Sequence, residues 1–152
     1  MAGVRAYVNS GEVALVASTA KTVLQLKAPT NQRLLIHSIR LLGKQAAGGT
    51  DPVVKVRVTR STANFGTGTG ATPAKAVPSD SETLQATAAA NFTVEPTTPT
   101  DSGMWWEVQP EGGVIEFLPP GHEIVVPGGQ SVNFEMTSTG TPTLLLTLGY
   151  FE

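Results

Sequence analysis

The sequence predicts an all-β protein, a jelly-roll-like β-sandwich with one short helix in a long loop. Three observations lead to this fold class. Apolar and polar residues alternate along many short segments, as they do in strands with one buried and one solvent-facing side. Clusters of glycine and proline separate these segments, in a chain with 16 glycines and 11 prolines. Only one segment carries a helix signal, and the length fits a single domain over residues 1–152.

The strand signals begin near the N-terminus and continue to the end of the chain. In residues 54–58 three valines alternate with Lys55 and Arg57, and in residues 131–136 apolar residues alternate with Asn133 and Glu135. In chain order, we expect strands at residues 5–9, 12–17, 23–27, 33–42, 54–58, 104–108, 114–118, 123–126, 131–136 and 143–151.

The segment 33–42 changes its alternation halfway along. Leu34 and Ile36 share one face of the expected strand, whereas Ile39 and Leu41 have the opposite parity. One extra residue near His37 would bring all four side chains back to the same face. The pattern therefore predicts a β-bulge, or a strand that changes sheet, at this point.

Residues 61–90 interrupt the alternation and are expected to form the long loop with its short helix. Residues 61–78 are rich in Gly, Thr, Pro and Ala, and loops of this length usually form an interface, move or carry function. Ser79 and Glu82 then have the spacing of a capping box. Because helix-forming residues follow, we expect the helix at about residues 80–90.

Composition excludes several classes of function. A net charge of −2 without a basic cluster argues against nucleic-acid binding, which needs lysines and arginines gathered against phosphates. No apolar run approaches the 18 residues of a membrane span, so no membrane partner is expected. The absence of cysteine excludes disulfides, thiolate metal sites and thiol catalysis. The N-terminus lacks the apolar core of a secretory signal, so we expect synthesis in the cytoplasm.

No catalytic, cofactor or metal site is predicted. His37 and His122 belong neither to a nucleophile motif nor to a spaced ligand set. The glycine-rich residues 66–70 lack the Lys-Ser/Thr pair of a phosphate-binding loop. The carboxylates are spread over turns and strands, and their spacing singles out no pair for glycoside hydrolysis. The chain is therefore not expected to be an enzyme.

Apolar residues that point to both sides of a strand suggest contacts between subunits. Trp105 and Trp106 are adjacent, so their side chains must leave opposite sides of the sheet. Leu145 and Phe151 face away from the leucines at the even positions of the last strand. In a chain with only 14% charged residues, such strands favour an oligomer that covers both faces.

Residues 1–10 are a candidate N-terminal arm for a contact with another chain. Val4, Ala6 and Val8 alternate with polar residues and could add a strand to the sheet edge of a neighbour. The loop at residues 61–78 ranks second for this role, because it has few apolar side chains with which to pack on its own core.

The second half of the chain resembles a known group of proteins. The residues that carry the resemblance are 91–97 (Asn-Phe-Thr-Val-Glu-Pro-Thr), 109–113 (Gln-Pro-Glu-Gly-Gly), 119–129 (Pro-Pro-Gly-His-Glu-Ile-Val-Val-Pro-Gly-Gly) and 149–152 (Gly-Tyr-Phe-Glu). With the Gly/Thr-rich loop after residues 54–58, they are similar to the small virion proteins of tailed bacteriophages. Within that group the chain looks most like the head decoration (cement) proteins of jelly-roll or β-tulip type, and the resemblance covers roughly residues 30–152.

The resemblance implies a structural role without a cofactor. A decoration protein of this type sits as a homotrimer at local threefold positions on the outer capsid surface. There it binds the major capsid protein and stabilises the shell. The interface candidates named above are Trp105, Trp106, Leu145, Phe151, Val4, Ala6 and Val8.

Two other classes of function stay open at this stage. One is a carbohydrate-binding jelly roll of a phage tail or baseplate, in which an exposed Trp105 or Trp106 stacks on a sugar. The other is an esterase-like or cupin enzyme, which the distribution of histidines and carboxylates disfavours.

Overall fold

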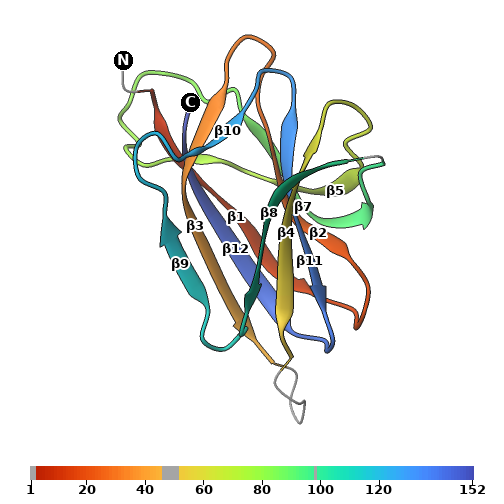
Figure 1. The fold of residues 1–152 in the computed structure, drawn as a ribbon. Coiled ribbons are helices and arrows are strands. Elements are labelled where there is room, and N and C mark those ends of the chain that lie inside the picture. The colour runs from red at the N-terminus through yellow and green to blue at the C-terminus, as the bar shows by residue number, and fades with distance from the viewer. Residues whose placement is uncertain (1–2, 46–51, 98) are drawn as a thin grey trace.

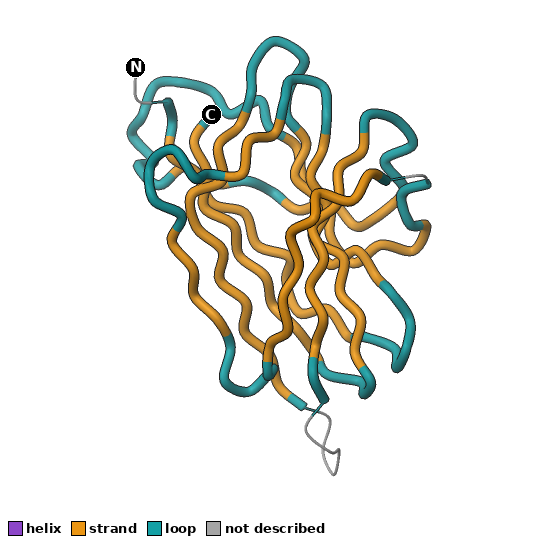
Figure 2. Tube along the Cα trace, in the orientation of Figure 1, coloured by secondary structure: helices purple, strands orange, loops and turns teal. Residues whose placement is uncertain are grey.

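The structure is a computed structural model that describes residues 3–45, 52–97 and 99–152. This part of the chain forms two antiparallel sheets that pack face to face (Figure 1), which confirms the all-β sandwich. It contains no helix (Figure 2), and therefore no helix able to span a membrane. One of the glycine- and proline-containing segments expected to separate strands, residues 47–52, lies outside the described residues except for Pro52.

Sheet I contains six strands. Its order is β10-β3-β12-β1-β6, and β9 also pairs with β3. The strands are β1 (Arg5–Ala14), β3 (Leu34–Lys44), β6 (Ala74–Lys75), β9 (Val114–Phe117), β10 (Ile124–Val126) and β12 (Thr143–Phe151).

Sheet II also contains six strands, in the order β5-β7-β2-β11-β4-β8. The strands are β2 (Lys21–Lys27), β4 (Val54–Ser61), β5 (Thr67–Ala71), β7 (Thr87–Val94), β8 (Thr100–Val108) and β11 (Ser131–Ser138). The chain passes from one sheet to the other at each step from β1 to β4 and again from β11 to β12, as in a jelly-roll-like sandwich.

One continuous cluster of buried apolar side chains fills the space between the sheets. Alternation puts every second residue of β12 into it, so that Leu144, Leu146 and Leu148 are fully buried. Phe134 of β11 meets them from sheet II. Each such side chain contributes about 1.5–3 kcal/mol relative to exposure, so this core is the main source of stability.

The predicted bulge lies at His37. Ser38 pairs with Gly149 of β12, but the next pair is Ile36 with Tyr150, so His37 is the extra residue on β3. The shift turns both Ile36 and Ile39 into the core, where each is at most 1% exposed.

The expected helix at residues 80–90 is wrong. Residues 79–86 have no regular secondary structure, and β7 begins at Thr87. The side chain of Asp80 accepts the N–H of Glu82 at 3.2 Å, which makes a local turn instead of a helix cap. The carboxylate of Glu152 accepts the N–H groups of Gln85 and Ala86, at 2.6 and 3.1 Å. Tertiary partners thus satisfy the backbone and override the local helix propensity.

The expected long loop at residues 61–78 is only partly a loop. Residues 67–71 form β5, which pairs with β7 at the edge of sheet II, and β6 pairs with β1. A side chain at Gly68 would lie 2.6 Å from the carbonyl oxygen of Ala90, so glycine permits this close approach.

The candidate N-terminal arm is also wrong, because its residues 5–10 belong to β1 of the protein's own sheet. β1 joins the two strands expected at residues 5–9 and 12–17, and it hydrogen-bonds to β12 on one side and β6 on the other. Val4, Ala6 and Val8 are at most 5% exposed. With both edges paired and the apolar side chains buried, this segment cannot add a strand to a neighbour.

Candidate functional site

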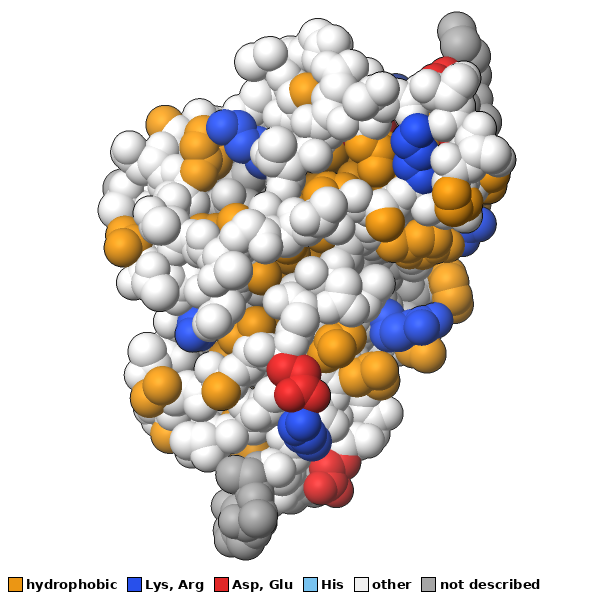
Figure 3. Space-filling view, turned by 180° about the vertical axis from the view of Figure 1, so that it is seen from behind, with side chains coloured by type: hydrophobic (Ala, Val, Ile, Leu, Met, Phe, Trp, Pro, Cys, Tyr) orange, Lys and Arg blue, Asp and Glu red, His pale blue; other side chains and the backbone are white. Residues whose placement is uncertain are grey.

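The outer face of sheet I carries a row of large apolar side chains. Leu145 of β12 lies opposite Leu42 of β3, which is 47% exposed. On the neighbouring β9, Ile115 lies opposite Arg40 and is 55% exposed, and Phe117 is 68% exposed. We call Leu42, Ile115, Phe117 and Leu145 the apolar stripe. The view from behind shows hydrophobic side chains reaching the surface in several places, with Lys and Arg side chains among them (Figure 3).

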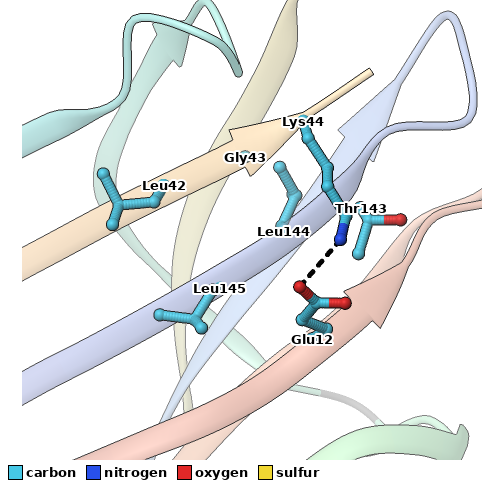
Figure 4. Close-up of a pocket in the computed structure, with 7 residues that line it drawn as sticks. All are labelled: Glu12, Leu42, Gly43, Lys44, Thr143, Leu144 and Leu145. Atoms are coloured by element: carbon cyan, nitrogen blue, oxygen red, sulfur yellow. Dashed lines mark hydrogen bonds and ion pairs between the residues drawn. The ribbon is translucent and has the colours of Figure 1, made fainter. Parts of the chain in front are cut away.

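A hollow of about 230 Å³ lies at one end of the apolar stripe (Figure 4). Leu42 and Leu145 form its apolar wall. An ion pair between Lys44 Nζ and Glu12 Oε1, at 2.8 Å, forms its rim. Both charged side chains are more than 60% exposed, so this pair contributes little to stability.

A wider groove of about 410 Å³ crosses the same face from β1 to β9. Phe117 and Tyr7 stand at its two sides, and Arg5 and Arg40 supply positive charge. Among the residues that the structure describes, neither arginine has a carboxylate within 4 Å. Arg5 lies over the ring of Tyr7, 5.4 Å from its centroid.

An aromatic cluster lies beside this groove, where the bulge places His37. Its ring centroid is 6.3 Å from that of Tyr7 and 4.7 Å from that of Phe151. A side chain on Gly149 would lie within 3 Å of both His37 and Tyr7, so glycine makes room for these rings. Burial lowers the pKa of His37, and the charge of Arg5 lowers it further.

The outer face of sheet II presents one exposed indole beside paired charges. Trp105 is 64% exposed and lies opposite Arg57 of β4. Arg57 Nε is 2.9 Å from Asp101 Oδ2, and Arg57 Nη1 is 3.5 Å from Glu135 Oε1. These groups and Thr137 line a hollow of about 370 Å³, which we call the Trp105 hollow.

Burial controls the charge of Glu135 in the Trp105 hollow. Desolvation raises the pKa of this carboxyl above its ordinary value of 4.5. The Arg57 guanidinium acts in the opposite direction, and the nearby carboxylates Glu95 and Asp101 add to the rise.

A neighbouring patch of this outer face, where β11 lies between β2 and β4, is polar and buried. Asn133 is fully buried and bonds to Thr59 and Ser61 through its amide nitrogen, at 3.1 and 2.9 Å. Its oxygen accepts from Gln25 at 2.8 Å, and Gln25 also donates to the carbonyl of Phe65 at 2.9 Å. This network connects three strands of sheet II and binds the backbone at Phe65, so it has a structural role.

The structure does not bring the predicted interface residues together. Trp105 lies on the outer face of sheet II and Leu145 on that of sheet I, while Phe151 is half-buried against His37. Trp106 faces inward, packs against the core and has no hydrogen-bond partner for its buried indole nitrogen in the described chain. The side chains of Val4, Ala6 and Val8 are buried in the protein's own core.

Sequence reasoning missed several residues of these surfaces. Residues 114–118 read as a strand, but nothing local indicates that Ile115 and Phe117 stay uncovered. Arg57, Asp101 and Glu135 come from three strands, and only the pairing of β4 with β8 and β11 brings them together. His122 lies in a turn, where its N–H bonds to the carbonyl of Pro119 at 2.9 Å. In residues 3–45, 52–97 and 99–152, no three His, Asp or Glu side chains are grouped so that they could hold a metal ion.

Comparison with known proteins adds no relative: no family model and no curated protein matches this chain.

Proposed function

We propose that this chain is a structural subunit of a virion, a decoration (cement) protein of a tailed bacteriophage head. In this role it forms a homotrimer on the outer capsid surface, binds the major capsid protein and stabilises the shell, after synthesis in the host cytoplasm. The observation that carries the proposal is the apolar stripe on the outer face of sheet I, in which Leu42, Ile115 and Phe117 are exposed and Leu145 is half-buried.

The apolar stripe supports self-association because its exposure is unfavourable in water. Isolated apolar side chains are common on protein surfaces, but contiguous rows usually mark an interaction site. Leu145 and Leu42 are direct cross-strand neighbours, and Ile115 and Phe117 lie on the adjacent strand, opposite Arg40 and Ser38. An obligate interface commonly buries on the order of 2,000 Å² or more, so it would extend beyond these four residues.

Threefold symmetry determines which surface of the neighbouring copy the apolar stripe contacts. In a cyclic trimer each interface joins two different surfaces, so the stripe of one copy would pack on another part of the next copy. The capsid contact then needs a further surface. Because β1 belongs to its own sheet, we place this contact in residues 61–78, where β5 is an edge strand and Val77 is 56% exposed.

The test of self-association is the mass in solution. We expect light scattering at micromolar concentration to give three times the monomer mass. Phe117→Glu and Leu145→Glu should each give a monomer, because they place a charge in the interface. The matched control is Val94→Glu, which changes an exposed valine outside the apolar stripe and should leave the trimer intact. A monomeric wild-type chain would refute the proposed trimer.

The test of the capsid role is binding to shells that lack decoration. We expect the wild-type chain to sediment with such capsids and to raise their melting temperature. Val77→Asp should weaken binding while the trimer mass stays unchanged. A trimer that binds no capsid would refute the role while leaving the self-association in place.

A further inference from the structure

We propose that the Trp105 hollow binds a neutral saccharide, with the indole as a stacking platform. The hollow lies on the outer face of sheet II and shares no residue with the apolar stripe. The inference is thus independent of the proposed self-association.

The indole supplies the apolar part of the site. Trp105 is 64% exposed, whereas its neighbour Trp106 packs against the core. Trp105 stands at the edge of the sheet on β8, opposite Arg57. A largely exposed ring that is anchored in a strand offers a flat surface to a ligand. The entropic cost of fixing this ring is small, because the side chain has only two rotatable angles. The C–H faces of sugar rings match such a surface.

The charged groups of the hollow are already paired, which favours a neutral ligand. Arg57 is held between Asp101 and Glu135, at 2.9 and 3.5 Å. The next cross-strand pair, Lys55 and Glu107, also contains opposite charges, 3.7 Å apart. An ion would have to disrupt these pairs, whereas a hydroxyl-rich neutral molecule can donate to the carboxylates and accept from the guanidinium.

The polar groups are also fixed in place before any ligand arrives. Asp101 Oδ1 accepts the N–H of Gly103 at 2.8 Å, while its other oxygen holds Arg57. Such preorganisation reduces the entropy lost on binding. The volume of about 370 Å³ lies at the lower end of the range for small-molecule sites, which suits a ligand of one or two sugar rings.

The same features argue against a protein partner at this position. The centre of a protein–protein interface is depleted of Asp and Glu, although Trp and Arg are enriched there. Here the indole is surrounded by Arg57, Asp101 and Glu135, whereas the apolar stripe on the other sheet gathers four apolar side chains. A single aromatic ring among hydrogen-bonding groups resembles a sugar-binding surface more closely.

The experiment uses the full chain and its intrinsic fluorescence, because the sequence contains only two tryptophans. A glycan array with neutral, acidic and basic glycans identifies the ligand, and titration with a purified neutral oligosaccharide from the array measures affinity. We expect a neutral glycan to bind and to shift the emission of Trp105. Trp105→Ala should weaken binding about tenfold or more, and Asp101→Asn should weaken it several-fold.

Two controls separate this site from the rest of the protein. Trp106→Phe keeps Trp105 and should bind the sugar within about twofold of wild type, provided that the melting curve confirms folding. Phe117→Glu should also bind normally, even where it dissociates the trimer. The proposal is overturned if no neutral glycan binds at millimolar concentration, if only charged glycans bind, or if Trp105→Ala leaves the affinity unchanged. A loss of trimer or capsid binding in Trp105→Ala without any glycan binding would instead identify Trp105 as a protein contact.

Discussion

The two outer faces of the sandwich differ although both sheets have six antiparallel strands and share one core. On sheet I the outward side chains include the apolar stripe, and Arg5 and Arg40 have no carboxylate partner among the described residues. On sheet II a polar patch around Asn133 is buried and bonds to the backbone of Phe65 through Gln25, and Arg57 is paired with two carboxylates. The outer face of sheet I thus leaves apolar side chains exposed, whereas part of the outer face of sheet II satisfies its own hydrogen bonds.

The difference teaches where to seek partners in a β-sandwich of unknown function. A buried polar face that satisfies its own hydrogen bonds has little to gain from another molecule. An uncovered apolar face lowers its free energy when a partner excludes water from it. The Trp105 hollow is an exception on sheet II, because there the indole stays exposed.

The largest expected effect comes from breaking the hydrogen-bond network around Asn133 on the outer face of sheet II. Asn133→Ala should lower the free energy of unfolding by about 2–4 kcal/mol, because it leaves buried groups of Gln25, Thr59 and Ser61 without partners. The matched variant on sheet I is Asn9→Ala, whose exposed side chain bonds to Thr147 at 3.2 Å and should cost less than about 1 kcal/mol. Urea unfolding of both variants measures the difference. Equal losses in the free energy of unfolding would mean that the hydrogen-bond network around Asn133 does not stabilise sheet II.

The parts of the fold that depend on local sequence patterns could be predicted from the sequence. The alternation of residues 54–58 and 143–151 located two central strands, and the parity change around Leu34 and Ile39 located the bulge. These features depend only on neighbours along the chain, because side chains of a strand alternate whatever its partners are.

The features that escaped prediction depend on partners far away in the chain. Residues 87–90 look like helix formers, yet they pair with residues 24–27 of β2, and Glu152 holds the turn before them. Glycine-rich β5 has no apolar alternation and becomes a strand only because β7 is beside it. In the same way, the groups of the Trp105 hollow meet through strand register, which alternation along one segment does not reveal.

A smaller effect on the free energy of unfolding should distinguish Arg57, which forms ion pairs, from Arg40, which has no carboxylate within 4 Å among the described residues. Arg57→Gln removes the cation between Asp101 and Glu135, and we expect a loss of about 1 kcal/mol in the free energy of unfolding. Arg40→Gln on sheet I should change it by no more than about 0.3 kcal/mol, because no ion pair with the described residues is lost. Thermal and urea unfolding at low salt provide the measurement. A larger cost for Arg40 would show that the groove on sheet I is stabilised by a charge contact within the fold.

The smallest effect concerns the pH dependence of stability that arises from Glu135 in the Trp105 hollow. Because burial raises the pKa of Glu135, the folded protein holds a proton that the unfolded chain has already released above about pH 4.5. Stability from this group is therefore greatest below pH 4.5 and falls as pH rises through the raised pKa of the folded state. Glu135→Gln cannot titrate, so the stability of wild type relative to this variant should decrease by less than about 1 kcal/mol between pH 4 and pH 7.

Arg57 provides the control for this titration. The guanidinium opposes the rise in the pKa of Glu135, so the pH-dependent difference should grow when both proteins also carry Arg57→Gln. Urea unfolding of the four proteins at pH 4 and pH 7 gives the double difference. If wild type gains stability relative to Glu135→Gln as pH rises, Arg57 outweighs desolvation and the carboxylate is stabilised by its ion pair. The ion pair with Arg57 would then stabilise the charged form of Glu135 by more than burial destabilises it.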